Sequence, residues 1–137
     1  MKNIFTLDPQ LERDSFYVGE LSLCQVRLMN HADNVWLILI PKTPAVTELF
    51  ELTAQQQQAL MQEITHVSQL LKQHFPCDKL NVASLGNVVS QLHIHIVART
   101  KTDHHWPKPL WGTPLTAYPL IEVDSHIRQV REVLAIH

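Results

Sequence analysis

The stretch Gln91-Leu92-His93-Ile94-His95-Ile96-Val97-Ala98-Arg99 decides the fold, because apolar side chains occupy every second position along it. Successive side chains of a β-strand point to opposite faces. A strand here would turn the even-numbered apolar side chains toward the core. Gln91, His93, His95, Val97 and Arg99 would then share the other face, with neighbours about 7 Å apart. We expect this row to lie on the exposed side of a rigid sheet, where it can contact one ligand from several directions.

Three interpretations of the two histidines are open from the residues alone. His93 and His95 can be partly exposed strand residues without a role. They can also bind one zinc ion through neutral imidazoles, with His104, His105 or a residue distant in sequence as a further ligand. The third interpretation is nucleophilic catalysis at phosphorus, because a neutral imidazole offers a lone pair near pH 7 without prior deprotonation.

Further strands are expected on both sides of this stretch. The apolar run 35–40 predicts a central strand covered on both faces and ended by Pro41. Residues 16–18 and 21–29 predict two strands joined by a turn at Gly19-Glu20. Residues 79–85 and 92–100 predict two more, separated by Gly86-Asn87. Links this short between neighbouring strands favour antiparallel pairing.

Three helices are expected. Asp8-Pro9 resembles an N-cap followed by a first-turn proline, so a short helix should run to about Arg13. Thr53-Ala54-Gln55-Gln56 has the form of a capping box, and apolar residues recur at helical spacing from there to residue 75. Asp124 is the expected N-cap of a final helix. The order of elements predicts an α+β fold in a single domain, 1–137: an antiparallel sheet of about five strands, one long helix and a C-terminal helix.

Composition narrows the class of protein. The 137 residues are 45% hydrophobic with a net charge of −2, which excludes wholesale disorder and argues against a nucleic-acid partner. Cys24 and Cys77 are too few for a disulfide framework and are expected to be ordinary thiols in a reducing compartment. Residues 1–8 lack the apolar run of a signal peptide, and the longest apolar stretch is too short to span a bilayer. We expect a cytoplasmic protein that has no membrane partner.

The segment 91–97 resembles the signature of the histidine-triad (HIT) nucleotide hydrolases and transferases, His-φ-His-φ-His-φ-φ, where φ is apolar. The resemblance covers about residues 15 to 112. It includes the apolar strand closed by Ile40-Pro41-Lys42, the long helix 53–75, and an asparagine and a glycine ahead of the histidines, here Asn81 and Gly86. Arg99 and Trp106-Pro107 follow at familiar spacing. The chain is similar to a bacterial-type variant with glutamine in the first triad position.

The resemblance implies a two-step reaction without a cofactor. His93 would attack the α-phosphate of a nucleoside polyphosphate or phosphoramidate and form a nucleotidyl-histidine, which water would then hydrolyse. A main-chain carbonyl would fix the proton on the other nitrogen of His93, and His95 would hydrogen-bond the phosphate or the leaving group. The alternative is a nucleotide-binding module with little or no turnover.

The same resemblance suggests substrate-binding positions and an assembly. Asn81 would donate to the phosphate or brace the site, Asn87 is a second candidate for that position, and Asn30 approximates an acidic ribose-binding position. Each of the three can instead be a turn or capping residue. Family members commonly form homodimers through the long helix and adjacent strands, so a homodimer is expected.

Three departures from the family pattern each remove a proton donor. Gln91 can position phosphate but cannot titrate. Trp36 stands where the family has a further histidine, and Val88 stands where some members have a serine. The segment 106–112, rich in Trp and Pro, can cover an edge of the core, contact a second subunit or wall the substrate pocket. The histidines outside 91–105 are expected at the surface or in turns and are assigned no role.

Overall fold

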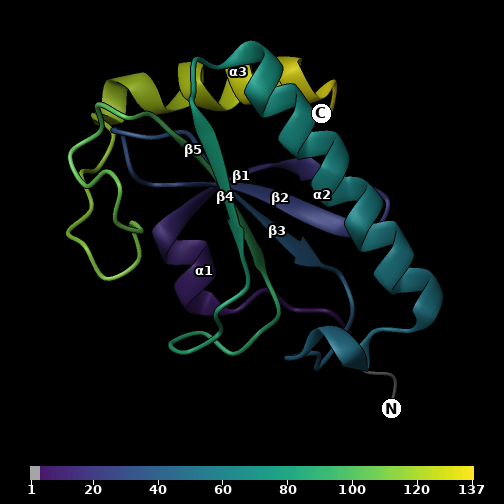
Figure 1. The fold of residues 1–137 in the computed structure, drawn as a ribbon. Helices are drawn as coiled ribbons and strands as arrows, with labels where there is room; N and C mark the ends of the chain where they lie inside the picture. The colour runs from purple at the N-terminus through teal and green to yellow at the C-terminus, as the bar shows by residue number, and fades with distance from the viewer. Residues whose placement is uncertain (1–3) are drawn as a thin grey trace.

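The computed structural model describes residues 4–137 and has the predicted α+β architecture (Figure 1). Residues 1–3, part of the segment tested for a signal peptide, lie outside the described residues. Five strands form one antiparallel sheet in the order β1-β2-β3-β5-β4. The elements are α1 (Pro9–Asp14), β1 (Ser15–Glu20), β2 (Cys24–Met29), β3 (Trp36–Pro41), α2 (Ala54–His74), β4 (Lys79–Ala83), β5 (Ile94–Arg99) and α3 (Val123–Leu134), with short 3₁₀ turns at Leu49–Glu51 and Leu120–Glu122.

The sheet has two differently covered faces. Helices α2 and α3 pack on one face, as Figure 1 shows, over an apolar core that includes Leu37, Ile96 and Leu71. Helix α1 and the loops that follow β4 and β5 cover the opposite face. Trp36 pairs with Val97 and Ile38 with His95 across β3 and β5, so these side chains share the second face. The predicted division of segment 91–99 into a core face and a site face is confirmed for the residues within β5.

The long helix is fixed at its start and along its length. The Thr53 hydroxyl accepts from the Gln56 N–H at 3.1 Å and the Gln56 side chain accepts from the Thr53 N–H at 2.9 Å, which confirms the predicted capping box. The Glu63 carboxylate accepts the backbone N–H groups of Leu23 and Cys24 at 2.8 and 3.0 Å. Glu63 therefore ties α2 to the first residue of β2.

The prediction of a turn between β1 and β2 at Gly19-Glu20 was wrong. Gly19 and Glu20 belong to β1, and the chain turns at residues 21–23, where the Leu21 N–H donates to the Cys24 carbonyl at 2.8 Å. Gly19 is needed for close packing: a Cβ there would lie 3.0 Å from the His137 carbonyl oxygen and 3.0 Å from Ile136. The C-terminal residues cross β1 at this point, and a contact so distant in sequence has no local signal.

Other predicted boundaries also shift. Strand β4 ends at residue 83 and β5 begins at residue 94, whereas the predicted strands were 79–85 and 92–100. Residues 84–93 form the loop between the two strands. The prediction that Asp124 caps α3 was wrong: Glu122 is the N-cap residue, without a side-chain cap, and Asp124 lies in the first turn. Asp8 does cap α1, accepting from the Gln10 N–H at 2.8 Å.

The two cysteines differ in exposure. Cys24 is buried in the helix-covered core and Cys77 is half-buried after α2; both are free. Burial, with the Glu63 carboxylate beside it, raises the pKa of the Cys24 thiol. Within residues 4–137 no helix is long and apolar enough to cross a membrane.

Candidate active site

His93 and His95 lie side by side at the start of β5, with their ring centroids 4.8 Å apart. Their side chains are only 6% and 5% exposed, so the expectation of an exposed row was wrong. The side chains do share the face opposite α2, but α1 and the loops after β4 and β5 cover that face. The two rings line a pocket of about 580 Å³.

The pocket is built by six segments that are distant in sequence. Helix α1 contributes residues between Gln10 and Asp14, and β2 and β3 contribute Met29 and Trp36. The loops 85–89 and 110–115 form the remaining walls around the two histidines. Most of the lining is apolar or neutral. Asp14 is the charged residue among the described lining residues, which include no lysine or arginine.

The backbone fixes the tautomer of His93. Its Nδ1 lies 2.7 Å from the Gln91 carbonyl oxygen, which can only accept, so Nδ1 must carry the proton. In the neutral ring, Nε2 therefore holds the free lone pair. The expected bond from the histidine to a main-chain carbonyl is present, and it leaves Nε2 as the nitrogen able to act as a nucleophile.

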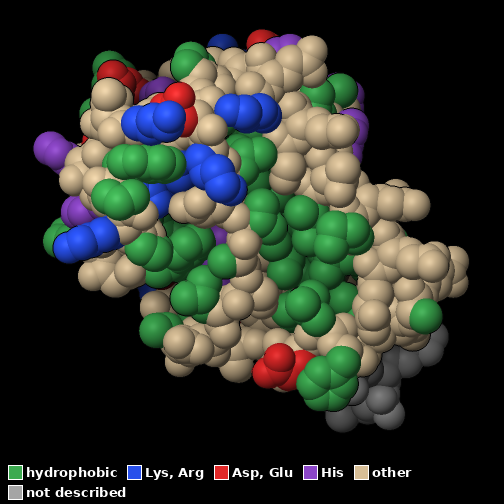
Figure 2. Space-filling view, in the orientation of Figure 1, with side chains coloured by type: hydrophobic (Ala, Val, Ile, Leu, Met, Phe, Trp, Pro, Cys, Tyr) green, Lys and Arg blue, Asp and Glu red, His purple; other side chains and the backbone are tan. Residues whose placement is uncertain are grey.

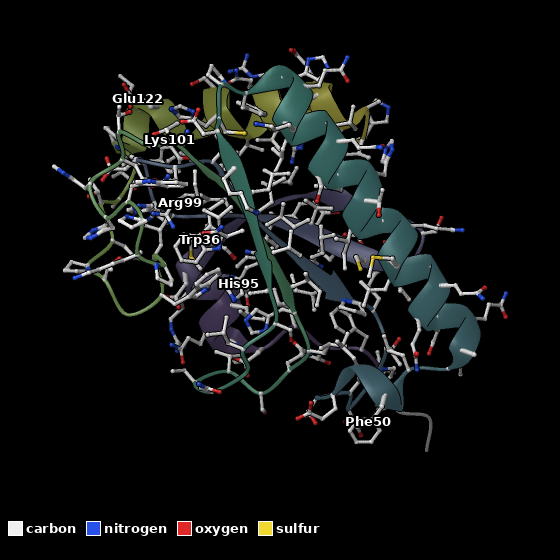
Figure 3. The ribbon with its side chains drawn as sticks, in the orientation of Figure 1. Trp36, Phe50, His95, Arg99, Lys101 and Glu122 are labelled. Carbon is white, nitrogen blue, oxygen red and sulfur yellow. The ribbon has the colours of Figure 1, made fainter. Side chains whose placement is uncertain are left out.

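The tautomer of His95 is fixed as the reverse of that of His93. The Trp36 indole Nε1–H donates to His95 Nδ1 at 2.9 Å, as their adjacent positions in Figure 3 indicate. Burial, with the neighbouring His93 as a smaller cause, lowers the pKa of His95 to about 3. His95 is therefore neutral near pH 7, with its proton on Nε2.

Gln91 is held away from the two rings. Its Oε1 accepts from the Asp8 N–H at 2.8 Å, and its Nε2 donates to the Thr6 carbonyl at 2.8 Å. Gln91 precedes β5 and does not line the pocket with His93 and His95. The structure thus brings two of the three expected catalytic side chains together and places the third against the N-terminal segment.

The three asparagines occupy different environments. Asn87 lines the pocket in the loop after β4. Asn81 of β4 lies outside the pocket lining, and its Oδ1 accepts from Arg99 Nη1 at 2.9 Å. Asn30 also lies outside it, and its Oδ1 accepts from the Tyr118 N–H at 2.9 Å, which ties the 113–119 segment to the end of β2. Of the three, only Asn87 is brought to the histidines.

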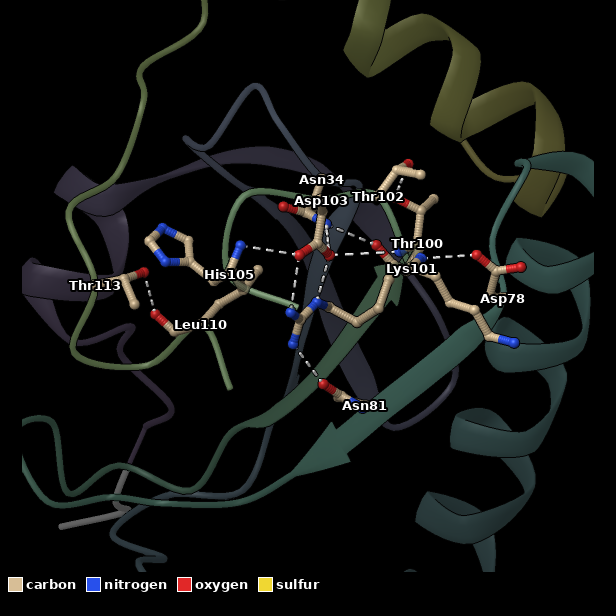
Figure 4. Close-up of polar contacts among 12 residues, drawn as sticks. Asn34, Asp78, Asn81, Thr100, Lys101, Thr102, Asp103, His105, Leu110 and Thr113 are labelled. Carbon is tan, nitrogen blue, oxygen red and sulfur yellow. Dashed lines mark hydrogen bonds and ion pairs between the residues drawn. The ribbon is translucent and has the colours of Figure 1, made fainter. Parts of the chain in front are cut away.

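A buried ion pair braces the loop that follows β5. Asp103 accepts from Arg99 Nε at 2.7 Å and from its Nη2 at 3.0 Å, and Asn34 Nδ2 donates to the same carboxylate at 3.2 Å (Figure 4). The Arg99 and Asp103 side chains are 1% and 5% exposed. Hydrogen bonds from Arg99 hold the pKa of Asp103 well below its usual range.

Sequence reasoning missed some residues of this region. Asp14, the last residue of α1, lines the pocket, and no local pattern marks it. Trp111 also lines the pocket, as one of the predicted alternatives for 106–112 allows, and its ring packs edge-on against His95 with centroids 5.3 Å apart. His31, expected at the surface, is 1% exposed and accepts the Thr116 N–H through Nδ1 at 3.0 Å. Burial lowers the pKa of His31.

A metal centre was one interpretation of the two histidines. Across residues 4–137, no group of three or more His, Cys, Asp or Glu side chains is placed to hold a metal ion. The Nδ1 atoms of both site histidines are engaged within the protein, by the Gln91 carbonyl and by Trp36.

Comparison with known proteins identifies the family. The model of the HIT domain family matches residues 10–102. A histidine triad protein from Bradyrhizobium japonicum is 40% identical with a TM-score of 0.91, and the match covers 96% of this chain and 98% of that one. One from Sinorhizobium meliloti is 42% identical, with a TM-score of 0.89 and coverage of 93% and 96%. One from Marinobacter aquaeolei is 38% identical, with a TM-score of 0.93 and coverage of 96% and 97%.

A search of curated proteins gave no match. The family model covers more than half of the chain, and the solved structures agree with it over nearly the whole length. The chain therefore belongs to the HIT domain family of histidine triad proteins.

Proposed function

We propose that the protein is a nucleotide hydrolase or nucleotidyl transferase that acts at the α-phosphate of a nucleoside polyphosphate or phosphoramidate through a nucleotidyl-histidine on His93. Members of its family are generally nucleotide-binding proteins with hydrolase or transferase activity. The observation that carries the proposal is the hydrogen bond from His93 Nδ1 to the Gln91 carbonyl at 2.7 Å. It leaves a lone pair on Nε2 of a ring that lines the pocket.

The two histidines have complementary roles in this scheme. His93 Nε2 attacks phosphorus, and the His95 Nε2–H donates to a non-bridging phosphate oxygen. One ring thus supplies a lone pair and the other a proton for hydrogen bonding, which matches the tautomers set by the Gln91 carbonyl and Trp36. Water then attacks the phosphorus of the intermediate and releases a nucleoside monophosphate and free His93.

A covalent intermediate is directly testable. Wild-type protein is mixed with an adenylated substrate labelled in the adenosine, denatured in alkali and analysed for labelled protein, because phosphorus–nitrogen bonds of this kind are lost in acid. We expect labelled protein that loses its label on acidification. His93→Ala should give no label and reduce turnover on the order of 10³-fold or more.

A matched control is available on α2. His74 is exposed on that helix, so His74→Ala should label like the wild type. A crystal soaked with a nucleoside monophosphate gives an independent test: phosphorus should lie about 3–3.5 Å from His93 Nε2. Turnover that survives His93→Ala, or phosphorus bound remote from Nε2, would refute the proposal.

The second candidate is a nucleotide-binding module with little or no turnover. It is favoured by the neutral state of His95, because burial lowers its pKa to about 3 and it offers no acidic proton near pH 7. Tight binding of a nucleoside monophosphate without product or labelled protein would select this function over hydrolysis.

We also infer a homodimer formed through α2 and β4. Strand β4 is an edge strand, and hydrophobic side chains gather between it and α2 on the face shown in Figure 2. A groove of about 380 Å³ there is lined by Leu49, Met61, Ile64 and Val82 among others. Met61 and Val82 are 61% and 47% exposed, which favours a second copy as a cover.

The oligomeric state in solution tests this assembly. Light scattering coupled to size exclusion should give twice the monomer mass of 15.8 kDa. Val82→Glu should shift the protein to monomer, since a carboxylate would be buried against the partner. Lys79→Glu changes charge at the other end of the same strand, where the side chain is exposed, and serves as the control. A monomeric wild type would overturn the inference.

A further inference from the structure

The bond between Trp36 and His95 constrains proton chemistry in the pocket. Trp36 is 2% exposed and His95 5%, and 2.9 Å separates Nε1 from Nδ1. An indole nitrogen can only donate, so His95 Nδ1 must act as the acceptor and carry no proton. A proton added to Nδ1 would set two N–H groups against each other in a buried space, where an unpaired polar group is costly.

We propose that Trp36 is a positioning residue that holds His95 as a neutral Nε2–H donor, so that His95 binds the substrate phosphate without giving a proton to the leaving group. This inference rests on the proposed function and narrows its substrate class. The lowered pKa of His95, caused mainly by burial, is consistent with it. Figure 3 labels Trp36 of β3 and His95 of β5 next to each other.

Other groups near the pair do not replace the missing acid. The titratable side chains that line the same pocket are His93, whose Nδ1–H is held by the Gln91 carbonyl, and Asp14 at the end of α1. Among the described residues, two buried cations share this face of the sheet. Arg27 of β2 donates to Ser15, and Arg99 of β5 is paired with Asp103. Trp111 contributes a second indole to the cluster but no titratable group.

The chemical step follows from this inventory. The lone pair of His93 Nε2 forms the bond to phosphorus, and the bond from phosphorus to the leaving atom breaks. The leaving group takes that electron pair and departs as its anion, because no proton reaches it from His95. Groups that are stable as anions should leave well, whereas amines and alkoxides should leave poorly. The favoured substrates are therefore nucleotidyl groups joined by an anhydride bond to a phosphate or a carboxylate.

The bond can be detected directly in the wild-type protein. With uniform ¹⁵N labelling, a scalar coupling across the hydrogen bond should connect Trp36 Nε1 to His95 Nδ1. Long-range ¹H–¹⁵N spectra at pH 7 should show the His95 proton on Nε2. The absence of this coupling, or a proton on Nδ1, would overturn the assignment of Trp36 whether or not the protein hydrolyses nucleotides.

Two variants separate the indole N–H from its ring. Trp36→Phe keeps an aromatic ring but removes the donor, so His95 should take up a proton at higher pH than in the wild type. Trp111→Phe is the matched control, because Trp111 packs against the same His95 ring while its buried Nε1 has no hydrogen-bond partner among the described residues. It should leave the coupling and the titration of His95 unchanged.

The kinetic readout is the dependence of rate on the leaving group. Aryl esters of adenosine monophosphate with phenols of graded acidity should show kcat/KM falling several-fold for each unit of phenol pKa in the wild type. Trp36→Phe should shrink the ratio between the best and the poorest leaving group by about 10-fold or more. Mere structural damage would lower all rates alike. A wild-type rate independent of phenol pKa would refute the inferred lack of proton donation, whereas no reaction with any ester would count against the proposed function.

Discussion

The face of the sheet under α2 and α3 and the face under α1 and the loops bury side chains of different kinds. The helix-covered face buries an apolar set that includes Leu37, Leu71 and Ile96. The opposite face also has an apolar cluster, but it buries charged and imidazole groups as well, among them Arg99 and His95. Burial of apolar surface stabilises the packing on the helix-covered face. The opposite face depends in addition on specific hydrogen-bond partners.

This difference makes the two faces sensitive to different changes. An apolar side chain can be shortened at the cost of a cavity, whereas a buried charge that loses its partner remains uncompensated. The site face should therefore respond most strongly to the loss of a polar partner, and the helix-covered face to the loss of volume.

The largest effect on stability is expected at the ion pair after β5. Asp103→Ala leaves Arg99 buried without its carboxylate and should lower the free energy of unfolding by about 3–5 kcal/mol. Urea denaturation measures the loss. Asp78→Ala removes an exposed carboxylate that accepts, within residues 4–137, only the Lys101 N–H, and it should cost less than about 1 kcal/mol. Equal losses for the two variants would show that the buried ion pair contributes no more to the free energy of unfolding than an exposed hydrogen bond does.

A cavity under α2 should come next. Leu71 is fully buried, so Leu71→Ala should lower the free energy of unfolding by about 2–4 kcal/mol. The kcat of the folded fraction should stay unchanged, because Leu71 packs on the face opposite the histidines. Gln69→Ala changes an exposed position two residues away and is the control. A fall in kcat for Leu71→Ala would break the separation between the two faces.

Acid should destabilise the site face before carboxylates titrate. The folded pKa of His95 is about 3 against an ordinary value of 6.5, so below about pH 6.5 the unfolded chain binds a proton that the folded protein excludes. Stability is therefore lost as pH falls from about 6.5 toward about 3. Between pH 7 and pH 5 the loss from this residue is about 2 kcal/mol.

Urea denaturation at several pH values checks this dependence. His95→Asn cannot titrate, so its stability should change less over the same interval, with His31 as a remaining contributor because burial lowers its pKa too. A wild-type free energy of unfolding that is flat between pH 7 and pH 5 would contradict the buried, neutral state of His95.

The smallest effect is expected at Gln91. Gln91→Ala removes two hydrogen bonds to the N-terminal segment and should cost about 1–2 kcal/mol, with faster amide exchange at Asp8. Gln91→Glu keeps the acceptor for the Asp8 N–H but sets a carboxylate oxygen against the Thr6 carbonyl, so it should not recover the lost stability. If Gln91→Ala instead greatly reduces kcat while the free energy of unfolding changes little, Gln91 acts on the substrate as the resemblance implies.

The sequence was sufficient where local chemistry decides the structure. Alternation along 91–99 gave the two faces of β5, and the capping box at Thr53 gave the start of α2, because both patterns depend on backbone geometry within a few residues. The resemblance also implied that a main-chain carbonyl fixes the proton of His93, but the structure was needed to identify Nδ1 as the donor and the Gln91 carbonyl as its acceptor.

Contacts between residues far apart in the sequence could not be predicted. Trp36 and His95 are 59 positions apart, so the substitution at Trp36 was visible but the bond that it makes was not. Gln91 reaches Asp8 and Thr6 across more than 80 positions, which no strand pattern predicts. The walls of the pocket likewise come from loops whose conformation depends on distant contacts such as that between Asn30 and Tyr118.

The unequal burial of the two thiols makes the protein selectively labelable without mutagenesis. Cys24 is enclosed, and its raised pKa keeps it in the unreactive thiol form, whereas Cys77 is partly open to solvent. A maleimide dye should therefore attach at Cys77 alone. Because Cys77 lies just beyond the C-terminal end of α2, energy transfer between dyes on two such subunits would report how the long helices are arranged when copies meet.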